Sequence, residues 1–166
     1  MNKERPHILV LPEDDANRQL ANGFHRRVDW DRQRRMQVLP VAGGWNEVLS
    51  LFVSDHIRLL ELWPSRFMVL LIDHDNDPQR LMRALKKIPN HLRDRVFVLG
   101  VLSEPEDLKP AFQLPLDEIG AELAEECRGD AGEKWGHNLL KHNASELDRL
   151  RQQLFPILFA GEAQAY

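Results

Sequence analysis

Residues 67–78 read FMVLLIDHDNDP, an apolar run that ends in a group of acids. The first six residues show no polar alternation, as expected of a strand that is covered on both faces of a sheet. Asp77 and Pro78 then suit the N-cap and the first turn of a helix. This stretch predicts a buried parallel strand, followed by an acidic loop and a helix.

The same alternation extends to both sides of this stretch. Three further apolar runs of strand length lie at residues 7–11, 36–41 and 96–102. Segments with apolar residues at helical spacing lie between and after these runs, at residues 16–27, 46–62, 78–88, 116–127 and 147–154. The order predicts an α/β fold with a mostly parallel four-stranded sheet, flanked by helices and followed by C-terminal helices.

The length of 166 residues suits a single domain, with 43% hydrophobic and 29% charged residues, and this composition excludes a disordered or fibrous chain. We expect its core at about residues 7–110 and a helical extension at about 111–160. No apolar run approaches the ~18 residues of a membrane helix, and residues 1–6 lack the apolar core of a signal peptide. With Cys127 as the single cysteine, a disulfide framework is excluded, and a cytoplasmic protein is expected.

The charge is unevenly divided. Residues 1–102 hold 16 Lys/Arg and 13 Asp/Glu, whereas residues 103–166 hold 6 and 13. Two basic clusters lie in the first part, comprising Arg26, Arg27, Arg32, Arg34 and Arg35, and then Arg80, Arg83, Lys86, Lys87, Arg93 and Arg95. Such clusters are either solvated surfaces or sites that hold phosphates. The net charge of -4 argues against uniform coating of nucleic acid but leaves room for a local basic patch.

Acidic residues collect where the predicted strands end. Glu13 follows the first strand, Asp73 and Asp75 follow the third, and Glu104, Glu106 and Asp107 follow the fourth. Parallel strands bring these ends to one edge of the sheet, where ligands of open α/β sheets bind. Carboxylates that meet there need a cation or protons, and Mg²⁺ or Mn²⁺ suits a few oxygen ligands. We therefore predict a metal site at Glu13, Asp73 and Asp75, the last two pointing the same way from an extended backbone.

Neighbouring residues have two interpretations each. Asp14 and Asp15 are ligands or favour the positive end of the next helix. Asp77 is either a helix cap or part of the metal site. In the metal site, Asp77, Asp14 and the acids at 104–107 would either contact the ligands of the first metal or bind a second one. Gly43-Gly44 forms a tight turn or offers N–H groups to a phosphate. His74, inside the acidic loop, is expected to be solvated.

These features together resemble the Toprim fold. The resemblance lies in a strand that ends in Glu13, a glycine-bearing turn after the second strand, and a strand that ends in Asp73-x-Asp75. Topoisomerases, bacterial primases, recombination proteins and nucleases of the overcoming-lysogenization-defect type share this fold. The resemblance implies that Glu13 acts as general acid/base or metal ligand, and that Asp73 and Asp75 bind Mg²⁺. Asp14 stands where many members of the family have glycine.

The resemblance covers about residues 7–110. The nuclease branch often carries an acidic cluster after the next strand, and residues 104–107 are similar to it. A small, free-standing protein of this kind is expected to be a metal-dependent nuclease or phosphoryl-transfer protein that acts on nucleic acid, with a link to phage defence. Phosphate contacts are expected from basic residues of the following helix, namely Arg80, Arg83, Lys86 and Lys87.

Two alternatives remain open. In one, the chain is a non-enzymatic subunit whose acidic C-terminal part docks onto a partner protein. In the other, residues 8–18 resemble the start of a response-regulator receiver domain, with Asp14 and Asp15 as metal ligands, Asp73 as phospho-acceptor and Lys109 against the phosphoryl group. Only 36 residues separate Asp73 from Lys109, and receivers place a further helix and strand between the two positions.

Overall fold

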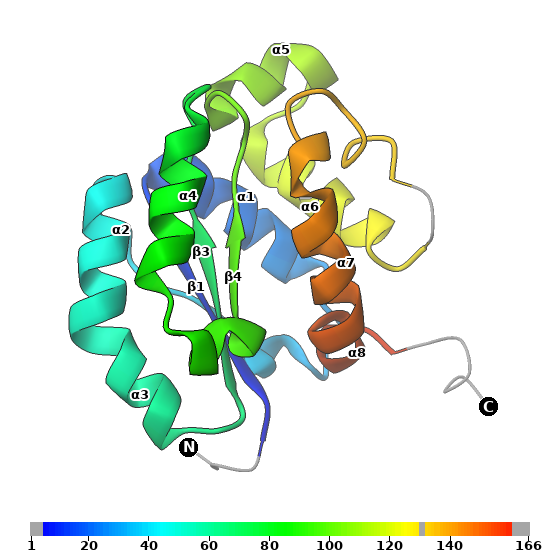
Figure 1. Cartoon of the computed structure of the whole chain (residues 1–166). Coiled ribbons are helices and arrows are strands. Elements are labelled where there is room, and N and C mark those ends of the chain that lie inside the picture. The colour runs from blue at the N-terminus through cyan, green and yellow to red at the C-terminus, as the bar shows by residue number, and fades with distance from the viewer. Residues whose placement is uncertain (1–4, 130–131, 161–166) are drawn as a thin grey trace.

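Four parallel strands form one sheet at the centre of the protein (Figure 1). The computed structural model describes residues 5–129 and 132–160. The strands are β1 (His7–Pro12), β2 (Met36–Val38), β3 (Arg66–Leu71) and β4 (Val96–Leu99), arranged in the order β2-β1-β3-β4. The predicted α/β class with a parallel four-stranded sheet is confirmed, and β1 and β3 are direct neighbours.

Helices cover both faces of the sheet. One layer packs on Ile8, Val10 and Val69, and consists of α1 (Asp15–Arg26), α6 (Leu116–Glu126), α7 (Ala144–Gln153) and α8 (Phe155–Leu158). The opposite layer packs on Leu9 and Met68, and consists of α2 (Trp45–Leu51), the π-helical turn η2 (Phe52–His56), α3 (Ile57–Leu62) and α4 (Pro78–Lys87). Successive strand residues therefore enter different cores, which is why the strands show no polar alternation.

Short elements complete the chain. They are η1 (Gln33–Arg35), η3 (Asn90–Arg95), η4 (Pro105–Asp107), α5 (Leu108–Phe112) and η5 (Lys141–Asn143). In the ranges that the structure describes, no helix is both long and apolar enough to cross a membrane.

Side chains from the C-terminal segment cap the edge strand β4. The Val98 N–H donates to Glu146 Oε2 at 2.8 Å, and the Gly100 N–H donates to Asn143 Oδ1 at 3.2 Å. Asn143 Nδ2 returns a hydrogen bond to the Gly100 carbonyl at 3.0 Å. Burial disfavours the charged form of Glu146, but donors from Arg93, Val98 and Arg149 outweigh it and lower its pKa. These bonds satisfy an edge that would otherwise offer free backbone groups to another strand.

The first basic cluster binds the C-terminal half of the same chain. Arg26 pairs with Asp117 at 3.2 Å, and Arg27 pairs with Glu125 at 3.4 Å. Arg32 and Arg35 donate to the carbonyls of Pro156 and Ile157 at 2.9 and 3.0 Å. The charge asymmetry seen in the sequence is therefore in part paired within the fold, which favours the structural interpretation of this cluster.

Glycine permits the close contact of α1 with α6. A Cβ atom at Gly120 would lie 2.0 Å from the Leu20 carbonyl oxygen, and one at Gly23 would lie 1.9 Å from that of Asp117. Such distances leave no room for a side chain, so the two helix backbones touch directly. This contact fixes α1, whose first turn lies at the carboxyl end of β1.

Gly120→Ala is expected to destabilise the fold by about 2 kcal/mol, because the added methyl group must push two backbones apart. Helix propensity alone would favour alanine. Gly129→Ala is the control, since a Cβ atom there has no described neighbour within 4 Å. Urea unfolding of both variants measures the difference, and equal stabilities would contradict the proposed close contact.

Candidate functional site

The pairing of β1 with β3 brings Glu13 and Asp73 together. Pro12 lies opposite Leu71, and the Glu13 N–H donates to the Leu71 carbonyl at 3.0 Å. One step further on, the Asp73 N–H donates to Glu13 Oε2 at 2.7 Å. The two residues are only 8% and 7% exposed. Two carboxylates that are 60 positions apart in the sequence thus share one buried place at the sheet edge.

Asn17 links this pair to the start of α1. Its side-chain Nδ2 donates to Asp73 Oδ1 at 2.9 Å and to Asp14 Oδ1 at 3.0 Å. Asp14 is the N-cap of α1, because the same oxygen accepts the Asn17 backbone N–H. Asn17 is not among the predicted site residues, although it continues the apolar stripe of Leu20 and Phe24 and is therefore recognisable in the sequence as a buried polar residue.

The glycine turn supports Glu13 from the other side. The N–H groups of Gly43 and Gly44 both donate to the Glu13 carbonyl, at 2.9 and 3.1 Å. Their φ angles of 104° and 154° explain why glycine is needed there. Because these N–H groups hold the Glu13 backbone, the tight-turn interpretation is supported over the phosphate-binding one.

The loop after β3 is turned rather than extended. Asp75 and Asn76 have φ angles of 49° and 54°, so the expectation that Asp73 and Asp75 point the same way from an extended backbone is wrong. The Asp75 side chain is 67% exposed and pairs with Arg80 at 3.3 Å. Asp77 caps α4 by accepting the Gln79 N–H at 2.9 Å, in agreement with its interpretation as a cap.

Arg80, at the start of α4, lies beside the acidic loop, and Arg83 lies one turn further along the helix. Arg80 donates to the Asp73 carbonyl at 3.1 Å, and its guanidinium lies over the Trp45 ring, 5.1 Å from the ring centroid. Arg83 lies over the same ring at 5.8 Å. Lys86 and Lys87 belong to the last turn of α4, at the far end of the helix. The four predicted phosphate contacts therefore fall into two separate groups.

The acids after β4 face the same edge. Glu104, Glu106 and Asp107 are exposed in and before η4. The charges of Glu106 and Asp107, with smaller effects of Asp75 and Asp14, raise the pKa of Glu104. Glu106 also contributes to the raised pKa of Asp73. The three acidic segments thus act on one another electrostatically, as their strand-end positions predicted.

Burial dominates the ionisation of the two central carboxyls. Desolvation, followed by the charges of Glu13, Asp14 and Glu106, raises the pKa of Asp73 to about 7 against the hydrogen bond from Asn17. Desolvation also raises the pKa of Glu13, despite the Asp73 N–H. In the part of the chain that the structure describes, no three His, Cys, Asp or Glu side chains form a ready metal-binding group. Two buried carboxylates and a nearby exposed acid are therefore what the site offers a cation.

His74 is buried, which corrects the expectation that it is solvated. Its ring lies 4.5 Å from the ring of His142, measured between centroids, and His142 Nε2 contacts the Gly100 carbonyl at 2.7 Å. Burial, then His142 and Arg80, lowers the pKa of His74 to about 4. Among the described residues, His74 Nε2 and His142 Nδ1 have no hydrogen-bond partner. A neutral imidazole pair thus backs the acidic loop.

The residues that the receiver interpretation requires lie in different environments: Asp73 is buried and Asp14 is linked to it through Asn17, whereas Asp15 and Lys109 are exposed. The Asp15 carboxylate is exposed and accepts hydrogen bonds from Arg18 and Gln19. Lys109 lies exposed in α5, after β4. Asp14 instead caps α1. The arrangement offers Glu13 and Asp73, rather than Asp14 and Asp15, as the buried acidic pair.

Comparisons of the chain with protein-family models, with curated proteins and with solved structures gave no match.

Asp73→Asn is expected to stabilise the metal-free protein at pH 8. The folded-state pKa of Asp73 is raised to about 7, so stability is lost as the pH rises from about 4 to about 7. The loss amounts to at most about 1.4 kcal/mol per pH unit. The asparagine variant has no carboxyl group to ionise, so it does not lose this stability as the pH rises. Its side-chain oxygen can still accept the hydrogen bond from Asn17.

Urea unfolding in the presence of a chelator, at pH 4.5 and pH 8, measures this difference. Asp94→Asn, an exposed substitution in η3, is the control and should follow the parent at both pH values. A variant that is no more stable than the parent at pH 8 would argue against a destabilised carboxylate at position 73.

Proposed function

We propose that the protein binds Mg²⁺ or Mn²⁺ at Glu13 and Asp73, with Asp75 nearby, and hydrolyses phosphodiester bonds of nucleic acid. The observation that carries this proposal is the contact of two buried carboxyl-bearing residues at the ends of adjacent central strands. Buried carboxylates are costly unless a cation or a proton compensates them. The resemblance to the Toprim fold assigns the same residues to metal binding.

The donor set fits a hard divalent ion. Magnesium commonly takes one or two protein carboxylates and keeps several waters, so Glu13 and Asp73 suffice without a third buried ligand. Asn17 would hold the Asp73 side chain in place while its carboxylate binds. When bound, such an ion stabilises the charge that develops on a phosphoryl group.

The geometry also suits Glu13 for proton transfer. Its Oε2 atom accepts the Asp73 N–H, and within the described residues no hydrogen bond occupies Oε1. The raised pKa of Glu13, caused first by its burial, brings this carboxyl closer to the operating pH of a general base. Glu13 would accept a proton from the attacking water. At the same time the water oxygen would bond to phosphorus, and the bond from phosphorus to the leaving oxygen would break.

Arg80 and Arg83 would hold the substrate backbone beside the carboxylates. Both guanidinium groups lie over Trp45, which keeps them at the site end of α4. Lys86 and Lys87, in the last turn, are assigned no contact in this proposal. A patch of this kind implies an affinity that weakens with salt.

The metal proposal predicts that millimolar Mg²⁺ or Mn²⁺ raises the melting temperature of the parent protein and supports cleavage of single- or double-stranded DNA or RNA. Asp73→Asn and Glu13→Gln should each lose both responses, because each removes a proposed ligand. Asp94→Asn, at the opposite end of the sheet, should keep both. Equal cleavage by the parent and by Asp73→Asn would refute the proposal.

The phosphate-contact proposal predicts different effects of two substitutions on α4. Arg83→Gln should weaken binding of a fluorescent oligonucleotide and reduce the slope of log K against log salt by about 1, as expected for one lost phosphate contact. Lys87→Gln, at the far end of the same helix, should leave affinity and slope unchanged. Anisotropy titrations at several salt concentrations measure both, and a larger effect of Lys87→Gln would place the contact elsewhere.

A further inference from the structure

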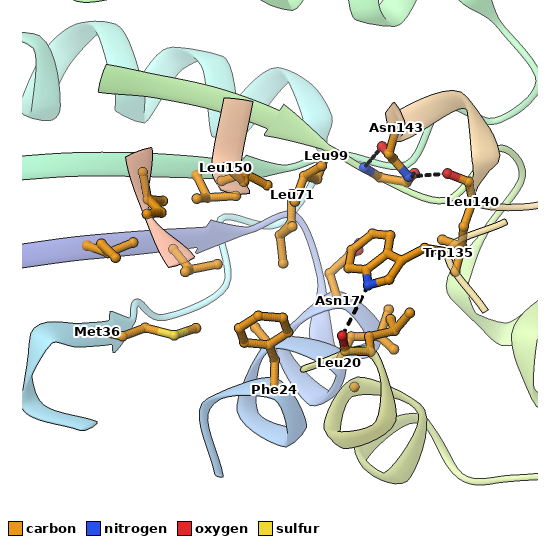
Figure 2. A pocket seen from close by; sticks show the side chains of 18 of the residues that line it. Asn17, Leu20, Phe24, Met36, Leu71, Leu99, Trp135, Leu140, Asn143 and Leu150 are labelled. Atoms are coloured by element: carbon orange, nitrogen blue, oxygen red, sulfur yellow. Dashed lines mark hydrogen bonds between the residues drawn. The ribbon is translucent and has the colours of Figure 1, made fainter. Parts of the chain in front are cut away.

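A cavity of about 110 Å³ lies between the sheet and the helical layer of α1, α6, α7 and α8 (Figure 2). Its walls include Val10 and Val69 from the sheet, Phe24 from α1, and Leu150 from α7. An apolar space of this size between the sheet and one helical layer is large enough to admit a small apolar ligand.

The walls of the cavity are almost entirely apolar. Asn17 uses both hydrogens of Nδ2 on Asp14 and Asp73, and Asn143 uses both of its own on the carbonyls of Gly100 and Leu140. The indole N–H of Trp135 donates to the Leu123 carbonyl at 3.1 Å. Figure 2 shows that the side-chain hydrogen bonds of Asn143 and Trp135 are made to other residues of the cavity wall. Among the described wall residues, the donors of these three side chains are thus all occupied, which disfavours water and charged ligands.

The cavity extends along the strands. Its walls include Ile8, near the start of β1, and Leu71, at the end of β3. Ile8 pairs with Phe67, four residues before Leu71, so these walls span roughly 13 Å at about 3.3 Å per residue. An engineered apolar cavity of about 150 Å³ holds one benzene ring. A slightly smaller space that is lined along the length of two strands suits a short chain better than a ring.

We propose that this cavity is a binding site for an uncharged ligand that carries a short, unbranched aliphatic chain of about four to six carbons. The site is separate from the carboxylates that face the strand ends, although Asn17 belongs to both. The inference does not depend on metal binding or on nuclease activity.

Titration of the full chain with 1-butanol, 1-pentanol, 1-hexanol, 1-octanol and benzene, followed by methyl NMR, tests the site. The methyl signals of Val10 and Val69 should shift saturably, whereas those of Val48 and Val98, in the opposite core, should not. Each added CH₂ should tighten the dissociation constant about fourfold until the cavity is full. Benzene should bind more weakly than 1-hexanol.

Two matched substitutions place the ligand. Val10→Ile takes room for one carbon inside the cavity and should weaken 1-hexanol binding about fourfold, whereas Val98→Ile, on the other face of the same sheet, should not. Leu150→Ala should lengthen the chain at which affinity stops improving. An absence of saturable shifts, tighter binding of benzene, or equal binding by Val10→Ile and the parent would overturn the proposal.

Discussion

The parallel pairing of β1 with β3 is the constraint on which the rest of the structure depends. Both strands are apolar on both faces, so each must be covered by helices and paired along its length. Their register sets Pro12 against Leu71. Once this register is fixed, Glu13 follows Pro12 directly and Asp73 lies two residues beyond Leu71, so that the Asp73 N–H can donate to the Glu13 carboxylate.

The contact between Glu13 and Asp73 buries two acidic groups next to each other, which disfavours their charged forms. The surrounding groups offset this cost only in part. Asn17 donates to Asp73, Asp73 donates to Glu13, and Arg80 lies against the same loop. Even so, desolvation keeps the pKa values of both carboxyls raised. An energetically unfavourable pair of carboxyls at the carboxyl edge of a sheet is typical of sites that perform chemistry.

The C-terminal helices do more than extend the domain. Glu146 and Asn143 complete the edge of β4, and α6 carries the acidic partners of Arg26 and Arg27. The same helices close one face of the sheet over the cavity and bring His142 against His74. The acidic second half of the chain therefore serves the fold in part through internal pairing, which leaves less of its charge for docking a partner protein.

The sequence by itself determined the class of fold and the edge at which the acids gather, because apolar runs, helical spacing and the Asp77-Pro78 cap are local signals. It also indicated Glu13 and Asp73, since strand ends are visible in the pattern. It did not predict the position of Asp75, because a left-handed turn takes this residue out of the strand alternation. It also did not predict that Lys86 and Lys87, in the last turn of α4, lie at the far end of the helix from the carboxylates. Only the tertiary structure decided that His74 is buried, that Asn17 bridges Asp14 and Asp73, and that a cavity remains beside the sheet, because such packing depends on contacts between segments distant in the chain.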